Sequence, residues 1–182
     1  MTDMKVRIGF GLGTRTNLND ETYGTVVDAL ESHQFDSLWL SEKISGEAPD
    51  PLVAMAFGAG RTTNLKFGMS VMVLPGRNPV VLAKQLGTMD ALTGGRIDLG
   101  IGVGWLREEF DALGIPWERR GARTDEYVAA MRTLWSGNSV SFDGDFVSFS
   151  GVSSNPKPVN GSVPIVIGGH SDAAARRAGR LG

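Results

Sequence analysis

Two hydrophobic periods alternate along the chain, and each change of period marks a boundary between expected elements. Short unbroken apolar runs are typical of buried parallel strands, whereas apolar residues spaced three or four apart predict helices. Buried strands are predicted at residues 5–12, 35–40, 65–74, 96–103 and 164–167. Helices are predicted at residues 20–33, 52–60, 79–93, 124–135 and 172–181. Strand and helix follow each other regularly, and this order predicts an α/β fold with a parallel sheet.

The stretch 65–105 shows this pattern most clearly, as strand, loop, helix, turn and strand. Pro75-Gly76 ends its first strand, Pro79 opens the helix, and Gly94-Gly95 closes it. Two buried strands joined by a helix form a βαβ unit, and such units build parallel sheets.

The pattern fits two architectures, an open doubly wound sheet and a (β/α)8 barrel. An open sheet of the dinucleotide-binding kind carries the motif G-x-G-x-x-G after its first strand. Here Gly9-x-Gly11 is followed by Thr14 where the third glycine belongs, and Gly102-x-Gly104 is followed by Arg107. The missing third glycine argues against the open sheet.

Three segments lie outside the regular alternation. Residues 106–123 are polar and irregular, and Glu108-Glu109 within them is interpreted as a solvated helix start. Residues 139–149 predict a β-hairpin, with Asp143-Gly144 as a two-residue turn that permits positive φ at both central positions. Residues 153–163 form a linker rich in Pro, Gly, Ser and Asn. We expect the whole chain, residues 1–182, to form a single domain.

Composition excludes several classes of function. The formal net charge is −2, from 18 basic and 20 acidic residues, so no basic surplus points to nucleic acid or an anionic membrane. The absence of cysteine excludes disulfides, thiolate zinc sites and cysteine nucleophiles, and with two histidines no metal site is expected. No window has 18 consecutive apolar residues, and we expect a cytoplasmic protein.

In either architecture a ligand binds at the carboxyl ends of the parallel strands. Glycine at such an end lets the backbone approach a flat or phosphorylated ligand closely. The alternative, that these glycines only serve the strand-to-helix turns, stays open. The candidate site residues at the strand ends are Gly11, Glu42, Lys43, Ser70, Val71, Gly102, Gly104, Gly168, Gly169, His170 and Ser171.

These candidates suggest two kinds of chemistry. Gly168–Ser171 opens a helix, whose free N–H groups suit a phosphate, although Ser171 or Asp172 acting as a plain helix cap is the alternative. Arg77 is a second candidate for binding an anion. Glu42-Lys43 is an adjacent acid–base pair that could transfer protons, or else a solvated surface pair. A serine hydrolase is unsupported, because the G-x-S-x-G motif is missing.

The central stretch resembles the luciferase-like monooxygenase superfamily, and most closely its branch that uses the deazaflavin coenzyme F420. The resemblance is carried by FGMSVMVLPGRNPVVLAKQLGTMDALTGGRIDLGIGVGW. Supporting segments, which occur in the family's order, are FDSLWLSEKI, RGARTDEYVAAMRTLWSG and PIVIGGHSDAAARRAGRLG. The resemblance therefore covers nearly the whole chain.

The resemblance implies a (β/α)8 barrel that binds its coenzyme at the carboxyl ends of the strands, with hydride transfer at the deazaflavin C5. Ser70–Val71 matches a strand bulge where F420-dependent members have a non-proline cis peptide behind the ring. Gly102 and Gly104 match the strand end beside the ring, and Gly168–Ser171 matches the segment that binds the phosphate. Lys43 departs from the family pattern, since many members have histidine there.

Length limits what the resemblance implies, because a complete barrel needs about 250 residues. The 182 residues supply five βα units and a hairpin. We expect an N-terminal fragment that lacks activity alone. The alternatives are half of a barrel completed by a second chain, and a degenerate relative that folds as an open sheet.

Three functions follow from these considerations. The first is hydride transfer between F420 and a small organic substrate, by a protein that forms a homodimer in its full-length form. The second is an FMN-dependent two-component monooxygenase of the same superfamily. The third is a non-catalytic remnant that binds a flavin, or another protein through its open edge.

Overall fold

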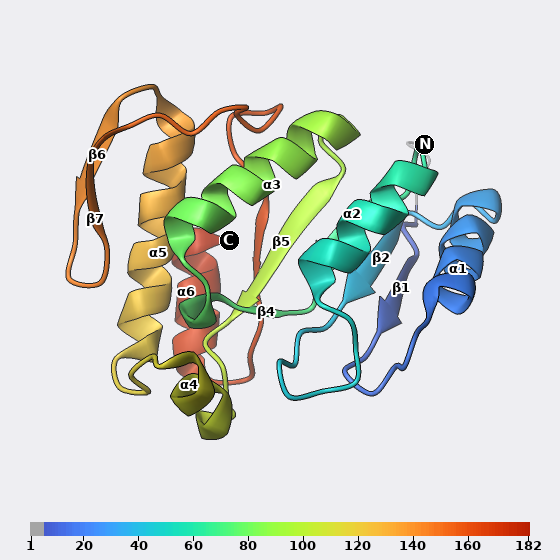
Figure 1. Ribbon diagram of the computed structural model, residues 1–182, viewed down its shortest axis with the longest axis horizontal. Coiled ribbons are helices and arrows are strands. Elements are labelled where there is room, and N and C mark those ends of the chain that lie inside the picture. Colours follow the sequence, from blue (N-terminus) through green and yellow to red (C-terminus); the bar gives the residue numbers. More distant parts are fainter. Residues whose placement is uncertain (1–5) are drawn as a thin grey trace.

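A curved, parallel six-stranded sheet forms the centre of the computed structural model, which describes residues 6–182 (Figure 1). The strand pairs follow the order β1, β2, β3, β5, β8, and β4 pairs with β5 beyond the end of β3. The strands are β1 (Gly9–Leu12), β2 (Ser37–Leu40), β3 (Lys66–Met69), β4 (Met72–Val73), β5 (Ile97–Gly102) and β8 (Ile165–Ile167). The expected parallel α/β fold is therefore confirmed.

Helices connect the strands and cover the sheet, and consecutive long helices lie next to each other: α1 with α2, α2 with α3, α3 with α5, and α5 with α6. Figure 1 shows α2 and α3 crossing in front of the strands. The helices are α1 (Asp20–Ser32), α2 (Pro51–Arg61), α3 (Pro79–Thr93), α4 (Arg107–Leu113), α5 (Arg120–Ser136) and α6 (Asp172–Leu181), with a 3-10 turn η1 (Leu74–Gly76).

Local signals set most helix ends. Asn19, Asp50, Asn78 and Ser171 are N-caps whose side chains accept hydrogen bonds from the first helical N–H groups. Gly94 ends α3 with φ of 70°, a left-handed conformation that suits glycine. These signals lie within a few residues of the boundary, so the sequence could predict them.

Arg96 fixes the start of β5 to the loop before β3. Its guanidinium donates to the carbonyl oxygens of Ala59, Thr62 and Leu65, at 3.1, 3.0 and 2.7 Å. Its Nε also donates to the carbonyl oxygen of Thr93, at the end of α3 (2.9 Å). One side chain therefore joins the C-terminal ends of α2 and α3 to the segment before β3, at the end of the strands opposite the carboxyl edge.

Two predicted strands differ from the structure. The strand predicted at residues 65–74 is interrupted, because β3 ends at Met69 and the chain re-forms as β4 at Met72. The strand predicted from residue 5 begins at Gly9, and residue 5 lies outside the described residues. The interruption of the long strand places Ser70 and Val71 outside the sheet, where they are free to line a cavity.

The segment 106–123 is more ordered than the prediction. It contains α4, and α5 begins at Arg120, four residues before the predicted start. The interpretation of Glu109 as solvated is wrong, because the Glu109 side chain is buried and accepts hydrogen bonds from the Ser45 N–H (3.1 Å) and Oγ (2.8 Å). The sequence did not predict the burial of this carboxylate, because its partner Ser45 lies 64 residues away.

The hairpin exists, but its turn differs from the prediction. Strands β6 (Val140–Asp143) and β7 (Ser148–Val152) are joined by four residues, 144–147, and positive φ occurs at Ser139 and Gly151 instead of at Asp143-Gly144. The Glu126 carboxylate on α5 accepts the three N–H groups of Asp145, Phe146 and Val147, at 2.9, 2.7 and 2.9 Å. A carboxylate on another element therefore shapes this turn.

Candidate functional site

A cavity of about 760 Å³ opens at the carboxyl ends of the parallel strands. Its walls are the loops after β1, β2, β5 and β8, the interruption between β3 and β4, and the first turns of α5 and α6. The predicted site residues that line it are Glu42, Ser70, Val71, Gly102, Gly104, Gly168, Gly169, His170 and Ser171. Residues that were predicted at four separate strand ends therefore line one cavity.

Gly11 and Lys43 are the predicted site residues that do not line the cavity. Gly11 pairs with Trp39 inside β1, and no atom outside its own neighbours lies within 4 Å of the position a Cβ would take. The Lys43 side chain lies against Gly46 in its own turn. Lys43 therefore does not form the acid–base pair with Glu42 that the sequence suggested.

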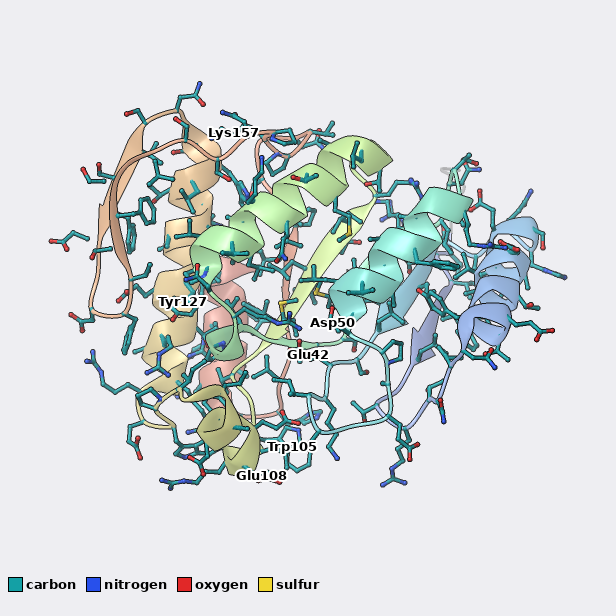
Figure 2. The ribbon with its side chains drawn as sticks, in the orientation of Figure 1. Glu42, Asp50, Trp105, Glu108, Tyr127 and Lys157 are labelled. Carbon is teal, nitrogen blue, oxygen red and sulfur yellow. The ribbon has the colours of Figure 1, made fainter. Side chains whose placement is uncertain are left out.

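Glu42, which Figure 2 labels, pairs instead with Arg77. Its side chain is buried, with Oε1 accepting from Arg77 Nη2 and Oε2 accepting from the Val73 N–H at 2.6 Å. Arg77 Nη2 also reaches Asp50 Oδ2 at 2.5 Å. Burial raises the pKa of the Glu42 carboxyl above its ordinary value, against the opposing effect of the Arg77 guanidinium.

The Glu42 pair also corrects the interpretation of Arg77 as a residue for binding an anion. Its guanidinium charge is balanced inside the protein by two carboxylates, those of Glu42 and Asp50. Both oxygens of Glu42 accept hydrogen bonds, from Arg77 and Val73, so its carboxylate acts as a fixed anchor within the cavity wall.

Residues 41 and 42 hold the interruption between β3 and β4 through hydrogen bonds at Ser70, Val71 and Val73. Ser41 Oγ donates to the Ser70 carbonyl oxygen (2.7 Å), and the Glu42 N–H donates to that of Val71 (3.3 Å). The third is the hydrogen bond from the Val73 N–H to Glu42. The Ser70–Val71 peptide bond is cis, as the resemblance implies.

Glycines at two neighbouring strand ends make room for the Val71 side chain. A Cβ added at Gly102 would lie 2.7 Å from Val71 Cγ2, and one added at Gly168 would lie 2.6 Å from Val71 Cγ1. Both distances are far below ordinary carbon–carbon contact. Val71 therefore occupies the space that the sequence interpretation assigned to a ligand at these glycines, and its isopropyl group forms part of the cavity wall.

Gly104 has a similar role beneath an aromatic pair. A Cβ there would lie 2.6 Å from the Phe110 ring, and φ is 80°. The Phe110 ring packs edge-on against Trp117, with centroids 5.1 Å apart. The small residue after β5 thus lets α4 close down on the strand end.

The helix start after β8 has the features expected of an anion site. Ser171 is the N-cap of α6, with its Oγ accepting from the Ala174 N–H (3.2 Å), and the first turn of a helix leaves N–H groups without intrahelical acceptors. Gly169 adopts φ of 127°. Asp172, whose charge would repel an anion, does not line the cavity, whereas Ala173 does.

Three arginines, at the start of α5 and on α6, were missed by the sequence interpretation. Arg119, Arg120 and Arg177 all line the cavity, as does the exposed indole of Trp105, which Figure 2 labels. The basic sequence 119–123 is visible in the sequence, but it falls in the segment interpreted as irregular. The start of α5 brings Arg119 and Arg120 to the cavity, and α6 adds Arg177; these three side chains are called the cationic wall below.

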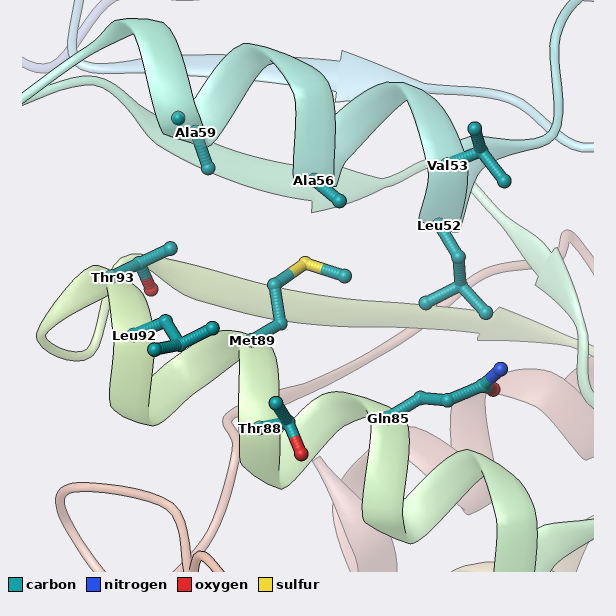
Figure 3. A pocket seen from close by; sticks show the side chains of 10 residues that line it. Leu52, Val53, Ala56, Ala59, Gln85, Thr88, Met89, Leu92 and Thr93 are labelled. Atoms are coloured by element: carbon teal, nitrogen blue, oxygen red, sulfur yellow. The ribbon is translucent and has the colours of Figure 1, made fainter.

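A second groove, of about 490 Å³, lies between α2 and α3 and is apolar (Figure 3). Leu52, Ala56, Met89 and Leu92 line it, and the ten lining residues include no ionisable side chain. It therefore offers no acid, base or charged group for chemistry. Leu92 is 83% exposed beside it, so this surface is unusually apolar.

Two features are absent from residues 6–182. No cluster of three or more histidine or carboxylate side chains that could hold a metal occurs among them. None of the helices in this described part combines the length and the apolarity needed to cross a bilayer.

Comparison with known proteins gives the family. The sequence profile described as luciferase-like monooxygenase matches residues 9–182, so the chain belongs to the luciferase-like monooxygenase family. An uncharacterised protein of Mycobacterium tuberculosis is 40% identical over 119 residues, 65% of this chain and 41% of the relative. An FMNH2-dependent dimethylsulfone monooxygenase of Pseudomonas fluorescens is 42% identical over 113 residues, 60% of this chain and 31% of the relative.

A solved structure shares the fold over almost the whole chain. The F420-dependent secondary alcohol dehydrogenase in complex with an F420–acetone adduct superposes with a TM-score of 0.81 and 23% identity. The match covers 98% of this chain and 57% of that enzyme, and at this identity it shows the fold alone. The chain spans less than half of the two curated relatives and about half of the solved structure. The expected barrel-type fold is thereby confirmed.

Proposed function

We propose that this chain forms the coenzyme-binding part of an oxidoreductase that transfers a hydride between F420 and a small organic substrate. The observation that carries the proposal is the cavity at the strand ends, which combines the start of α6 with a cationic wall. Family membership supports a flavin or deazaflavin oxidoreductase. The cationic wall favours F420 over FMN, because F420 carries glutamyl carboxylates in addition to a phosphate.

The residues present fit such a coenzyme. The cavity volume of about 760 Å³ is within the range of cofactor sites, and its strand-end wall presents Val71 and backbone, a surface suited to a flat ring. The same cavity presents the N–H groups at the start of α6 and the Arg120 guanidinium, which makes no ion pair with the described residues 6–182, and both kinds of donor suit oxyanions. The deazaflavin would supply the hydride donor or acceptor at its C5 carbon.

The chain's own residues position the coenzyme within this cavity. Val71, held between Gly102 and Gly168, would support one face of the ring, and the first turn of α6 would hold the phosphate. Ser41 and Glu42 act as positioning residues, since they fix the backbone of residues 70–73. Lys43 has no part in this arrangement, because it does not line the cavity.

A second candidate is an FMN-dependent monooxygenase. The Pseudomonas fluorescens relative, 42% identical over 113 residues, is named as FMNH2-dependent. The same cavity would take FMN with its single phosphate at α6. In this case Arg119 and Arg120 would not need to face an anion of the coenzyme.

Titration separates the two candidates. Purified protein is titrated with F420 and, anaerobically, with FMNH2, and binding is followed by coenzyme fluorescence or equilibrium dialysis. We expect F420 to bind at least about tenfold more tightly than FMNH2, in line with one additional charge-assisted contact. Tight binding of FMNH2 with no response to F420 would replace the first candidate by the second.

We propose a small-molecule substrate, a homodimer for the full-length protein and a cytoplasmic location. Light scattering of the protein measures the mass of the particle directly, and a monomeric mass for the full-length protein would contradict the dimer.

A further inference from the structure

The three arginines of the cationic wall differ in how their charges are balanced. Arg119 pairs with Asp145 at 2.6 Å, and Arg177 pairs with Asp125 while donating to the Gly121 carbonyl oxygen (3.2 Å). Arg120 makes no ion pair with any of the described residues 6–182. It is therefore the arginine of this wall whose charge has no counter-charge in that part of the chain.

The position of the Arg120 guanidinium is nevertheless fixed. Its Cζ lies 3.8 Å from the centroid of the Trp117 ring, and its Nε donates to the Gly104 carbonyl oxygen (3.3 Å). Trp117 is itself held against the buried Phe110 ring. The stack leaves both Nη groups of Arg120 without a hydrogen-bond acceptor among the described residues, beside the cavity that the side chain lines.

The position of Arg120 in the cavity indicates which kind of ligand group its guanidinium contacts. The bond from Arg177 to Gly121, the residue after Arg120, holds α6 against the start of α5. Arg120 therefore lies close to α6, whose residues Ala173 and Ala174 line the same cavity. A fixed guanidinium with free Nη groups binds phosphate or carboxylate through two parallel hydrogen bonds.

We propose that Arg120 is an oxyanion-binding residue of the coenzyme site, acting in addition to the N–H groups of α6. This inference rests on the proposed function, because it needs a bound coenzyme that carries an oxyanion. The oxyanion is either the phosphate of the coenzyme or a carboxylate of its glutamyl tail. Both have the same chemistry towards a guanidinium, and binding experiments with shortened coenzymes distinguish them.

The experiment measures the affinity of three ligands: F420, F420 without its glutamyl tail, and the 5-deazaflavin with only its ribityl chain. The proteins are the wild type, Arg120→Gln, Arg120→Lys and, as a matched control, Arg107→Gln. Arg107 is exposed and does not line the cavity, yet its replacement changes the net charge equally. The uncharged deazaflavin reports whether the cavity of each variant is intact.

We expect Arg120→Gln to weaken F420 binding by about ten- to hundredfold and binding of the uncharged deazaflavin by less than about twofold. Arg120→Lys should lie between, and Arg107→Gln should match the wild type. If the tailless coenzyme is weakened equally, the phosphate is the partner; if it is spared, the tail is. Equal loss for all three ligands, or no loss for any, overturns the inference. A wild type that binds none of them overturns the proposed function itself.

Discussion

Replacing Gly102 by alanine tests whether the strand ends hold Val71 in place. The added Cβ would lie 2.7 Å from Val71 Cγ2, whereas its next neighbours are Val71 Cβ at 3.8 Å and the Met72 carbonyl oxygen at 4.0 Å. The Cγ2 methyl group of Val71 is therefore the one group that would clash with the added Cβ. The φ of Gly102 is outside the left-handed region, so alanine adds no backbone strain there.

The size of the effect follows from these contacts. Forcing a methyl group into occupied space costs about 1–3 kcal/mol, of which about 0.5–1 kcal/mol is offset by the lower chain entropy of the unfolded alanine variant. Val71→Ala alone removes two methyl groups from a half-buried side chain and costs about 1 kcal/mol. In the double variant Cγ2 is absent, so the clash disappears, and we expect a favourable coupling of about 1–3 kcal/mol.

Urea denaturation of the wild type, both single variants and the double variant gives the coupling energy. Intrinsic tryptophan fluorescence reports unfolding, and equal slopes show that the denatured states are comparable. Gly60→Ala combined with Val71→Ala is the matched control, because a Cβ at Gly60 meets no atom within 4 Å. Additivity of Gly102→Ala and Val71→Ala within about 0.5 kcal/mol would refute the account of the Val71 wall.

Three further predictions concern stability. Partial burial raises the pKa of Glu31, but the hydrogen bonds from the N–H groups of residues 63–65 outweigh it and lower the pKa to about 2. The stability that the Glu31 carboxylate contributes is present above about pH 4.5 and is lost as the pH falls towards 2. Glu31→Gln should therefore reduce the loss of unfolding free energy between pH 4.5 and 2 by about 1 kcal/mol, after allowance for exposure. Gly87→Ala should destabilise by about 1–2 kcal/mol, because its Cβ would lie 2.7 Å from a linker carbonyl oxygen, whereas Gly60→Ala in denaturant should be neutral or stabilising. Glu42→Gln should lower the free energy of unfolding, measured by urea titration, by about 2–4 kcal/mol, because the new amide NH2 group would face a donor, either the Val73 N–H or Arg77. A change no larger than that of Glu47→Gln, at an exposed position, would contradict the role of Glu42 as an anchor.

The sequence predicted those parts of the fold whose causes are local. Asn78 caps α3 three residues before the N–H it satisfies, and Gly94 supplies the left-handed residue that ends the same helix. The strand ends were predicted to converge because parallel strands share a carboxyl edge. Nine of the predicted site residues line one cavity for this reason.

The sequence could not predict features that depend on partners far along the chain. Glu42 was paired with its neighbour Lys43, but its partner Arg77 lies 35 residues away. The space at Gly102 and Gly168 is occupied by Val71, which lies about 30 and 100 residues earlier in the chain, in the interruption between β3 and β4. The start of α5 carries no local signal, since Arg119 is in a left-handed conformation and makes no capping hydrogen bond. The cationic wall was therefore missed.

The order of strands in the sheet has a consequence for how the molecule assembles. Apart from β1 and β4, each strand of the sheet pairs with at least one strand that precedes it in the chain: β2 with β1, β3 with β2, β5 with β3 and β4, and β8 with β5. A chain synthesised from its N-terminus can therefore add one βα unit at a time to a surface that already exists. The unit formed by β8 and α6 carries the helix start that lines the cavity, and it pairs with the earlier strand β5. This part of the cavity wall forms only after the earlier units are in place, so a ligand bound there selectively stabilises molecules in which those units have docked.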